Sequence, residues 1–235
     1  MSLVSPSAAL AIDPLRVVIT GAAGALGTAV TDAFIRAGHD VIGIDKHEGG
    51  NANPHARWLM AEDLSVAEQA RASISTSADL LGGIDVVIHL VGAFAWSPIA
   101  ASTAALWRDL YAANVETAFN VIQAALPHLR DGSSVLCVGA AAAQPAAAGM
   151  APYAAAKSGV ARLVEALSAE LRPRSIRVNA ILPAIIDTPR NRADMPDADP
   201  AQWTSPEAIA DVLLFLAGRQ SRAISGALIP VSNPG

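Results

Sequence analysis

The sequence predicts an α/β fold in which one doubly wound parallel sheet of about seven strands carries helices on both faces. Two observations predict it. Short β-branched runs alternate with amphipathic helical patterns from residue 16 to residue 231, which is typical of parallel strands joined by right-handed helical crossovers. The run D-V-V-I-H-L at 85–90 is of the apolar kind expected for a strand buried on both faces.

The first strand, helix and second strand follow from the local pattern. R-V-V-I-T at 16–20 is a β-branched run, and segment 25–37 places apolar residues at helical spacing. Gly38 then ends the helix, as glycine commonly does in the C′ position. V-I-G-I-D at 41–45 is the second strand.

The alternation continues to the carboxyl end. A helix over 103–129 has Pro127 near its end, and the segment 183–203 is expected to be irregular. T-S-P-E at 204–207 has the pattern of a capping box with proline in the first turn. The remaining strands are expected at 57–60, 85–90, 134–138, 177–182 and 227–231, and the remaining helices at 66–81, at 152–172 and from 204 to near Gly218.

Length and composition indicate one domain. The chain has 235 residues, of which 52% are hydrophobic, so it can bury a substantial core. We expect residues 1–14 to form a flexible tail and residues 15–235 to form a single domain that includes the loop 183–204. The sequence has no apolar run of membrane-spanning length and no signal-peptide pattern, so we expect a cytoplasmic protein with no membrane partner.

Charge and cysteine content exclude other classes. The net charge is −5 and the pI is about 5.5, without a cluster of Lys and Arg, so nucleic acid is not an expected partner. The one cysteine, Cys137, lies in the apolar run V-L-C-V, where it is expected to be a small buried hydrophobe outside any disulfide framework. No metal site is expected.

A glycine-rich turn follows the first strand. In T-G-A-A-G-A-L-G at 20–27, the glycines let the chain turn sharply and approach a pyrophosphate, while the next helix presents free N–H groups to the phosphates. This context predicts a Rossmann-type dinucleotide site. The residues expected to bind the cofactor here are Gly21, Ala23, Gly24, Leu26 and Gly27.

Two acidic residues follow the next strands. Asp45 ends the second strand, where a carboxylate accepts hydrogen bonds from the adenosine ribose and repels a 2′-phosphate, so NAD(H) is favoured over NADP(H). Lys46 and His47 follow it and soften the discrimination, which leaves NADP(H) as the alternative. Asp63 either reaches the adenine edge or caps the helix that follows Ser65.

The segment Y-A-A-A-K places Tyr153 and Lys157 four positions apart, hence on one face of a helix. A lysine ammonium beside a phenol favours the phenolate. It is therefore expected to lower the pKa of Tyr153, which makes this residue a proton donor or acceptor. The alternative is an ordinary surface pair.

The glycine turn, Asp45 and Y-A-A-A-K together resemble the short-chain dehydrogenase/reductase family over residues 15–232. The resemblance implies one NAD-binding oxidoreductase domain that transfers a hydride, with Tyr153 as acid/base and Lys157 holding the nicotinamide ribose. Asn114 matches the family's proton-relay asparagine, its alternative being a polar residue tolerated in a helix.

The resemblance extends to further cofactor contacts. Pro183 and Thr188 match the segment that contacts the nicotinamide carboxamide, and Gly92 ends the segment after the fourth strand. That segment is H-L-V-G where the family usually has N-N-A-G, and we expect its first residue, His89, to be a structural histidine at the end of a buried strand. A second departure is Ala25, where many members have glycine.

The most consequential departure is Ala140, which stands where the family has its catalytic serine. The quinonoid dihydropteridine reductase branch is similar in having alanine there while keeping the Tyr and Lys, and segment 187–204 resembles that branch's loop. The resemblance implies that Ala140, Tyr153, Phe94 and Trp96 line a pocket for a planar substrate. The alternative for both aromatic residues is that they seal loops against the core.

The sequence therefore predicts an NAD(H)-dependent reductase of a small, planar, conjugated substrate. The alternatives are a general ketone or alcohol dehydrogenase and a catalytically weak NAD-sensing protein. As the family implies, we expect a homodimer or homotetramer, built through the alanine-faced helices at 103–129 and 152–172.

Overall fold

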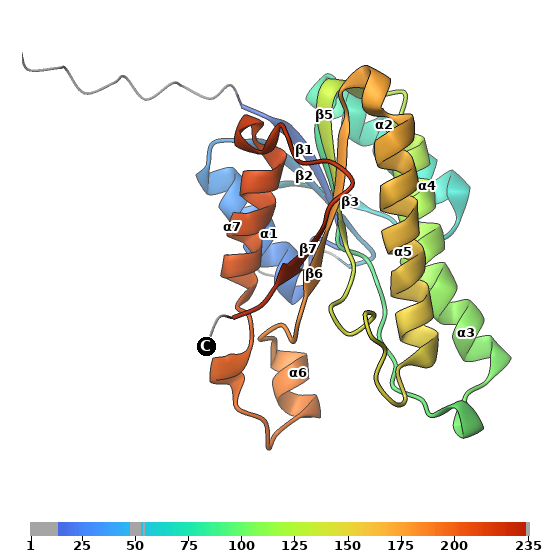
Figure 1. The fold of residues 1–235 in the computed structure, drawn as a ribbon. Helices are drawn as coiled ribbons and strands as arrows, with labels where there is room; N and C mark the ends of the chain where they lie inside the picture. Colours follow the sequence, from blue (N-terminus) through green and yellow to red (C-terminus); the bar gives the residue numbers. More distant parts are fainter. Residues whose placement is uncertain (1–13, 48–52, 54, 234–235) are drawn as a thin grey trace, which may run out of the picture.

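Parallel strands form the centre of the molecule, in a seven-stranded sheet of order β3-β2-β1-β4-β5-β6-β7. The structure, a computed structural model, describes residues 14–47, 53 and 55–233, so the tail predicted at 1–14 lies outside it except for Pro14. The fold predicted from the sequence is confirmed (Figure 1). The strands are β1 (Arg16–Thr20), β2 (Asp40–Asp45), β3 (Arg57–Met60), β4 (Ile84–His89), β5 (Leu129–Val138), β6 (Arg177–Pro183) and β7 (Leu228–Val231).

Helices cover both faces of this sheet, and most of them begin and end within two residues of the predicted bounds. No described helix is long and apolar enough to cross a membrane. The α-helices are α1 (Ala25–Arg36), α2 (Ala67–Leu81), α3 (Ala104–Tyr111), α4 (Thr117–Ala125), α5 (Ala151–Glu170), α6 (Pro189–Asp194) and α7 (Pro206–Ala217). A π-helical turn, η2 (Ala112–Glu116), joins α3 to α4, and short 3-10 turns lie at 99–101, 172–174, 200–202 and 219–221.

The prediction of one regular helix over 103–129 is wrong in its interior and at its end. The π turn interrupts the helix, and α4 ends at Ala125 because Pro127 has no N–H to donate to another turn. β5 accordingly begins at Leu129, earlier than the predicted 134, and its first residue pairs with Ile84 ahead of a register shift.

The segment 183–203, expected to be irregular, contains the short helix α6. The Thr188 hydroxyl accepts a hydrogen bond from the Asn191 N–H at 3.1 Å, and Pro189 occupies the first turn, where its missing N–H is not needed. The cap of α7 also lies one residue later than predicted. Its N-cap is Ser205, whose hydroxyl accepts from the Ala208 N–H.

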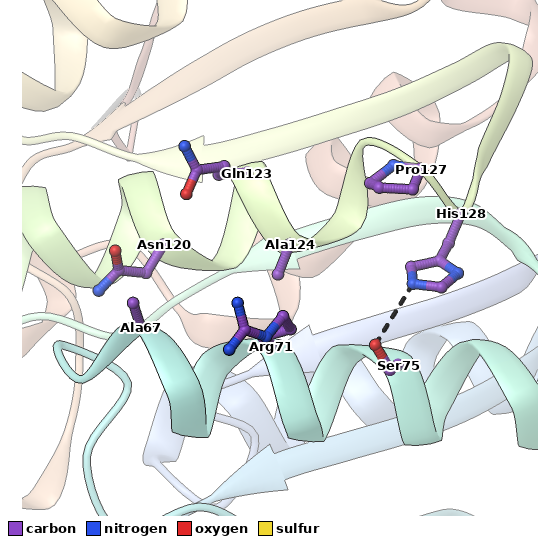
Figure 2. Close-up of a pocket in the computed structure, with 8 residues that line it drawn as sticks. All are labelled: Ala67, Arg71, Ser75, Asn120, Gln123, Ala124, Pro127 and His128. Carbon is purple, nitrogen blue, oxygen red and sulfur yellow. Dashed lines mark hydrogen bonds between the residues drawn. The ribbon is translucent and has the colours of Figure 1, made fainter.

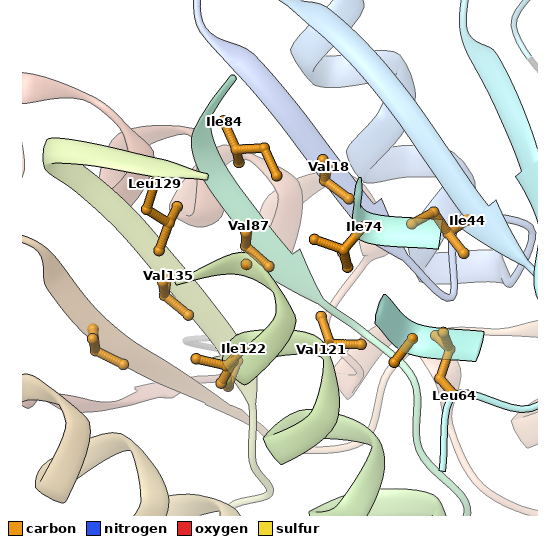
Figure 3. Packing of buried hydrophobic residues seen from close by; sticks show 14 of the residues in the cluster. Val18, Ile44, Leu64, Ile74, Ile84, Val87, Val121, Ile122, Leu129 and Val135 are labelled. Carbon is orange, nitrogen blue, oxygen red and sulfur yellow. The ribbon is translucent and has the colours of Figure 1, made fainter. Parts of the chain in front are cut away.

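Two hydrophobic cores lie on opposite faces of the sheet. Because side chains alternate along a strand, Val17 and Ile19 of β1 pack with α1 and α7, whereas Val18 packs with α2, α4 and α5. Figure 3 shows the second core, in which Ile74 of α2 and Val121 of α4 meet the strands.

The sheet positions the predicted site. The carboxyl ends of parallel strands share one edge, and the strand order reverses between β1 and β4, where α/β folds open a crevice for ligands. The predicted site residues lie at or after the ends of the strands β1 to β6, or on α5 and the π turn η2.

Candidate active site

The glycine turn after β1 is closely packed. Gly21 has φ 73°, and a Cβ added to Gly27 would lie 2.2 Å from the Gly21 carbonyl oxygen, so the turn admits no side chain there. Gly24 is the N-cap of α1; it provides no side-chain cap, and the described first turn of the helix contains no acidic residue. The first N–H groups of α1 are therefore available to an anion.

Asp45 lies against this turn. Its carboxylate accepts hydrogen bonds from the Ala23 N–H at 3.0 Å and from the His47 N–H at 3.2 Å. The structure thus brings together the end of β2 and the turn after β1, as predicted. Lys46 and His47 are exposed beside them.

Asp63 is held by its own turn. Its carboxylate accepts from the N–H and the hydroxyl of Ser65 at 2.8 Å and 2.7 Å, and its N–H donates to Gln69 at 2.9 Å. This bonding precedes α2, whose N-cap is Val66. A contact between Asp63 and adenine stays a prediction.

Lys157 and Tyr153 lie on α5, near its amino terminus. Lys157 is 6% exposed, and its ammonium donates to the Val138 carbonyl oxygen at 2.9 Å. Burial lowers the pKa of Lys157 to about 8, because a charged amine loses its hydration there.

The pKa of Tyr153 moves in the direction opposite to the sequence-based prediction. Burial raises the pKa of Tyr153 to about 12, since the phenolate is the form that desolvation disfavours. The expected lowering by the lysine is therefore wrong: Lys157 is bonded to Val138, and burial dominates the tyrosine. The Tyr153 hydroxyl is consequently protonated at neutral pH.

Asn114 lies in the π turn and joins this group. Its side-chain N–H groups donate to the carbonyl oxygens of Ala93 at 3.0 Å and Leu110 at 2.8 Å. A Cβ added to Gly92 would lie 2.6 Å from Asn114 Oδ1 and 3.0 Å from Lys157 Nζ. Asn114, Gly92 and Lys157, which come from three segments, therefore converge.

The oxygen of this asparagine is unpaired. Asn114 is 1% exposed, and its Oδ1 has no hydrogen-bond partner among the described residues. Because a buried acceptor without a partner costs about 1 to 3 kcal/mol, such an oxygen marks a position where water or a ligand hydroxyl donates.

Two aromatic residues follow β4 and behave differently. The ring of Phe94 meets that of Tyr153 edge to face, with centroids 4.9 Å apart, while 57% of the residue remains exposed. The Trp96 indole donates to the Ala148 carbonyl oxygen at 3.0 Å and covers Gly149. Phe94 thus lies against the Tyr153 ring, whereas Trp96 holds the loop between β5 and α5.

That loop contains no serine or threonine between Gly139 and Tyr153. Ala140 is buried, and its neighbour Ala141 donates its N–H to the Pro183 carbonyl oxygen at 3.0 Å. A methyl group therefore occupies the position after β5 at which the resemblance implied a hydroxyl. Thr188, as the cap of α6, uses its oxygen locally, and its contact with the carboxamide stays a prediction.

His89 is a structural histidine, as predicted. It is 2% exposed; its Nδ1 lies 2.8 Å from Thr20 Oγ1 and its Nε2 lies 3.2 Å from Thr117 Oγ1. Burial lowers the pKa of His89 to about 3, with a smaller contribution from Lys157, so the ring is neutral. The sequence pattern did not indicate either threonine partner.

A groove of about 280 Å³ lies elsewhere, between α2 and α4, and Figure 2 shows its lining. At one end Ser75 Oγ and His128 Nε2 are 3.4 Å apart. None of the predicted site residues lines this groove. In the described part of the chain, no cluster of three His, Cys, Asp or Glu side chains could hold a metal ion.

Comparison with known proteins decides the family. A family model described as enoyl-(acyl carrier protein) reductase matches residues 21–233. The chain belongs to the short-chain dehydrogenase/reductase family. It is an oxidoreductase of that family, and Tyr153, Lys157, Asn114 and the glycine turn described above lie at the expected edge of the sheet.

Relatives cover nearly the whole chain. An uncharacterized NAD-dependent oxidoreductase of Mycobacterium tuberculosis is 27% identical, over 91% of this chain and 92% of the relative. A 3-oxoacyl-[acyl-carrier-protein] reductase of Vibrio harveyi is 25% identical, over 91% and 94%. The structure of the aldohexose dehydrogenase of Thermoplasma acidophilum superposes with a TM-score of 0.84 at 25% identity, over 93% of this chain and 92% of that one.

The family implies a nicotinamide dinucleotide, and the residues present fit one. The turn at Gly27 admits no side chain and leaves the α1 amino terminus open to a pyrophosphate. Gly92, Lys157 and the unpaired oxygen of Asn114 form a polar cradle that a Cβ at residue 92 would fill. Asp45 would serve the adenosine ribose and Lys157 the nicotinamide ribose.

Proposed function

We propose that this protein is an NAD(H)-dependent reductase of a small, planar, conjugated acceptor, of the kind that quinonoid dihydropterins represent. The observation that carries the proposal is the composition of the catalytic face. The Tyr153 ring lies edge to face against the exposed Phe94, and the position of the family's serine holds the methyl group of Ala140. An aromatic wall beside one proton donor suits a flat ring.

Tyr153, Lys157 and Asn114 have separate roles in this reaction. When bound, NADH supplies the hydride. Tyr153, whose pKa of about 12 keeps it protonated at neutral pH, donates the proton. Lys157, whose pKa is about 8, is charged at neutral pH, and its ammonium would hold the nicotinamide ribose. The free acceptor of Asn114 holds a water or ribose hydroxyl beside that ammonium.

The missing hydroxyl selects the substrate class. Reduction of a ketone develops an alkoxide, and losing one donor to such an oxygen costs about 10² to 10³ in rate. A quinonoid imine spreads the incoming charge over its conjugated ring and needs a proton donor more than a second hydrogen bond. A site with Tyr153 and Ala140 therefore favours the conjugated acceptor.

We expect kcat/KM with a quinonoid dihydropterin to exceed that with a simple ketone by about a hundredfold or more, the value of the absent donor. Ala140→Ser should raise ketone reduction and leave the quinonoid reaction little changed. The measurement is NADH oxidation with both acceptors in both proteins, with Ala142→Ser on the same loop as control. Similar rates for both acceptors in the natural protein would favour a general ketone or alcohol dehydrogenase. Tight NADH binding without any turnover would favour an NAD-sensing protein.

The cofactor preference follows from Asp45. Its carboxylate lies at the glycine turn, where it would repel a 2′-phosphate, so NADH should bind more tightly than NADPH in a fluorescence titration. Asp45→Asn keeps an oxygen for the Ala23 N–H but removes the charge, and should narrow the ratio of the two dissociation constants by about tenfold. Asp40→Asn, exposed at the start of β2, is the control. Tighter binding of NADPH by the natural protein would refute this assignment.

The assembly we propose is a homodimer or homotetramer formed through α3, α4 and α5. Trp107, Tyr111 and Phe119 are 38%, 51% and 44% exposed on the first two helices, and an exposed aromatic row of this kind is typical of an interface. Light scattering at micromolar concentration should give a multiple of the 24.0 kDa chain mass. Phe119→Glu should lower that mass, whereas Met60→Glu on β3 should not. A monomer in the natural protein would contradict the proposal.

A further inference from the structure

A buried chain of hydrogen bonds runs through His89 from the end of β1 to the start of α4. Thr20, His89 and Thr117 are 0%, 2% and 3% exposed. The histidine ring lies between the two hydroxyls, with Nδ1 2.8 Å from Thr20 Oγ1 and Nε2 3.2 Å from Thr117 Oγ1. Thr20 and His89 are already paired across the neighbouring strands β1 and β4, and the bond to Thr117 extends this connection from the sheet to α4.

The direction of each bond follows from the last link. The Thr117 hydroxyl donates to the Ala113 carbonyl oxygen at 2.8 Å, and a hydroxyl has one proton to give. Thr117 Oγ1 must therefore accept from His89, which places the ring proton on Nε2. Nδ1 then carries no proton and accepts from the Thr20 hydroxyl. Each hydroxyl proton and each ring nitrogen in this series of bonds is then used once, with a neutral ring.

Both ends of this chain adjoin the candidate active site. Thr20 immediately precedes Gly21, the first residue of the glycine turn. Thr117 follows the π turn that contains Asn114, and its hydroxyl bonds to Ala113 inside that turn. A threonine hydroxyl that bonds back to the carbonyl of residue i−4 bends a helix, and single π turns are frequent at functional sites.

We propose that His89 is a positioning residue, which holds the glycine turn and the π turn in register through Thr20 and Thr117, so that Asn114 stays against Gly92 and Lys157. The inference rests on the proposed cofactor site and is independent of the identity of the substrate. The His89 ring makes no hydrogen bond to Tyr153 or to the residues expected to bind the cofactor, since its two partners are Thr20 and Thr117. Its effect on cofactor binding is indirect, because it fixes the glycine turn relative to the π turn.

The test is a double-mutant cycle read by NADH affinity. Thr117→Val keeps the side-chain shape and removes the link next to the π turn. It should weaken NADH binding about fivefold or more, although Thr117 is remote in sequence from the glycine turn. The same substitution in a His89→Leu background should have no further effect, because the connection is already broken. His89→Gln, which offers one acceptor and one donor, should retain more affinity than His89→Leu.

The chain offers a matched control in α1. Thr31 is 1% exposed, and its hydroxyl has no hydrogen-bond partner among the described residues, so Thr31→Val removes a buried hydroxyl but no link. It should leave NADH affinity unchanged. If His89→Leu does not fold, a cycle of Thr20→Val and Thr117→Val measures the same coupling across an intact ring.

A second readout concerns the ring alone. Long-range proton–nitrogen NMR spectra should show the Nε2–H tautomer of His89 at neutral pH, and Thr117→Val should shift its Nε2 resonance. The other tautomer, or additive effects of the substitutions on NADH affinity, would overturn the proposal. Failure of the quinonoid substrate would not affect either readout, whereas loss of NADH binding in the natural protein would count against the cofactor site itself.

Discussion

Tyr153→Phe should lower kcat by about 10² to 10⁴, the usual contribution of a general acid, with NADH affinity nearly intact. The substitution removes the hydroxyl and keeps the ring, so the edge-to-face contact with Phe94 at 4.9 Å persists. Between Gly139 and Tyr153 no serine or threonine can replace the lost donor. Initial rates of NADH oxidation, together with a fluorescence titration of NADH, separate the chemical step from binding.

The chain contains a matched control for this experiment. Its other tyrosine, Tyr111, is 51% exposed on α3, and Tyr111→Phe should leave kcat and NADH affinity as they are. Unchanged turnover in Tyr153→Phe would mean that water or another group delivers the proton, and the role assigned to Tyr153 would be wrong.

Lys157→Met should make the protein more stable and nearly inactive. The ammonium is buried against one carbonyl oxygen, without a described carboxylate partner, and its pKa falls from 10.5 to about 8. That shift corresponds to an unfavourable contribution of about 3 kcal/mol at neutral pH. An apolar side chain of similar length removes this cost, while loss of the ammonium removes the group that would hold the nicotinamide ribose and so weakens NADH binding.

The pH dependence gives a second measurement on the same variant. Between pH 8 and 10.5 the unfolded chain retains the lysine proton that the folded chain loses, so the natural protein gains stability as pH rises through this window, and Lys157→Met lacks that gain. Tyr153 acts in the opposite sense at higher pH: its raised folded pKa means that stability is lost as pH rises from 10 towards 12.

Urea denaturation at about pH 7 and about pH 9.5 tests this prediction. Lys46→Met, which changes an exposed lysine after β2, is the control and should show neither the gain at neutral pH nor the altered pH slope. A Lys157→Met protein less stable than the natural one at neutral pH would show that the ammonium contributes net stability where it lies. If Lys157→Met is the more stable protein, the natural chain keeps the destabilising charge of Lys157 for its function.

Local pattern determined most of the fold. β1, for example, begins and ends at the predicted residues, because a β-branched run followed by glycine leaves the chain few alternatives. The parallel order then places the residues after β1, β2, β4 and β5 at one edge of the sheet. Asp45, expected at the cofactor site from its place after the second strand, therefore lies at the same edge as Gly92 and Lys157, which the resemblance implied for that site.

The tertiary structure decided what depends on contacts between distant segments. The π turn at Asn114 could not be predicted, because the side chain that it presents bonds to Ala93 in the loop after β4. The partners of His89 lie on β1 and α4 for the same reason. Helical spacing correctly put Tyr153 and Lys157 on one face of α5. The direction of the Tyr153 pKa, however, depends on desolvation by the packed chain around it, and burial of that kind is a property of the assembled fold.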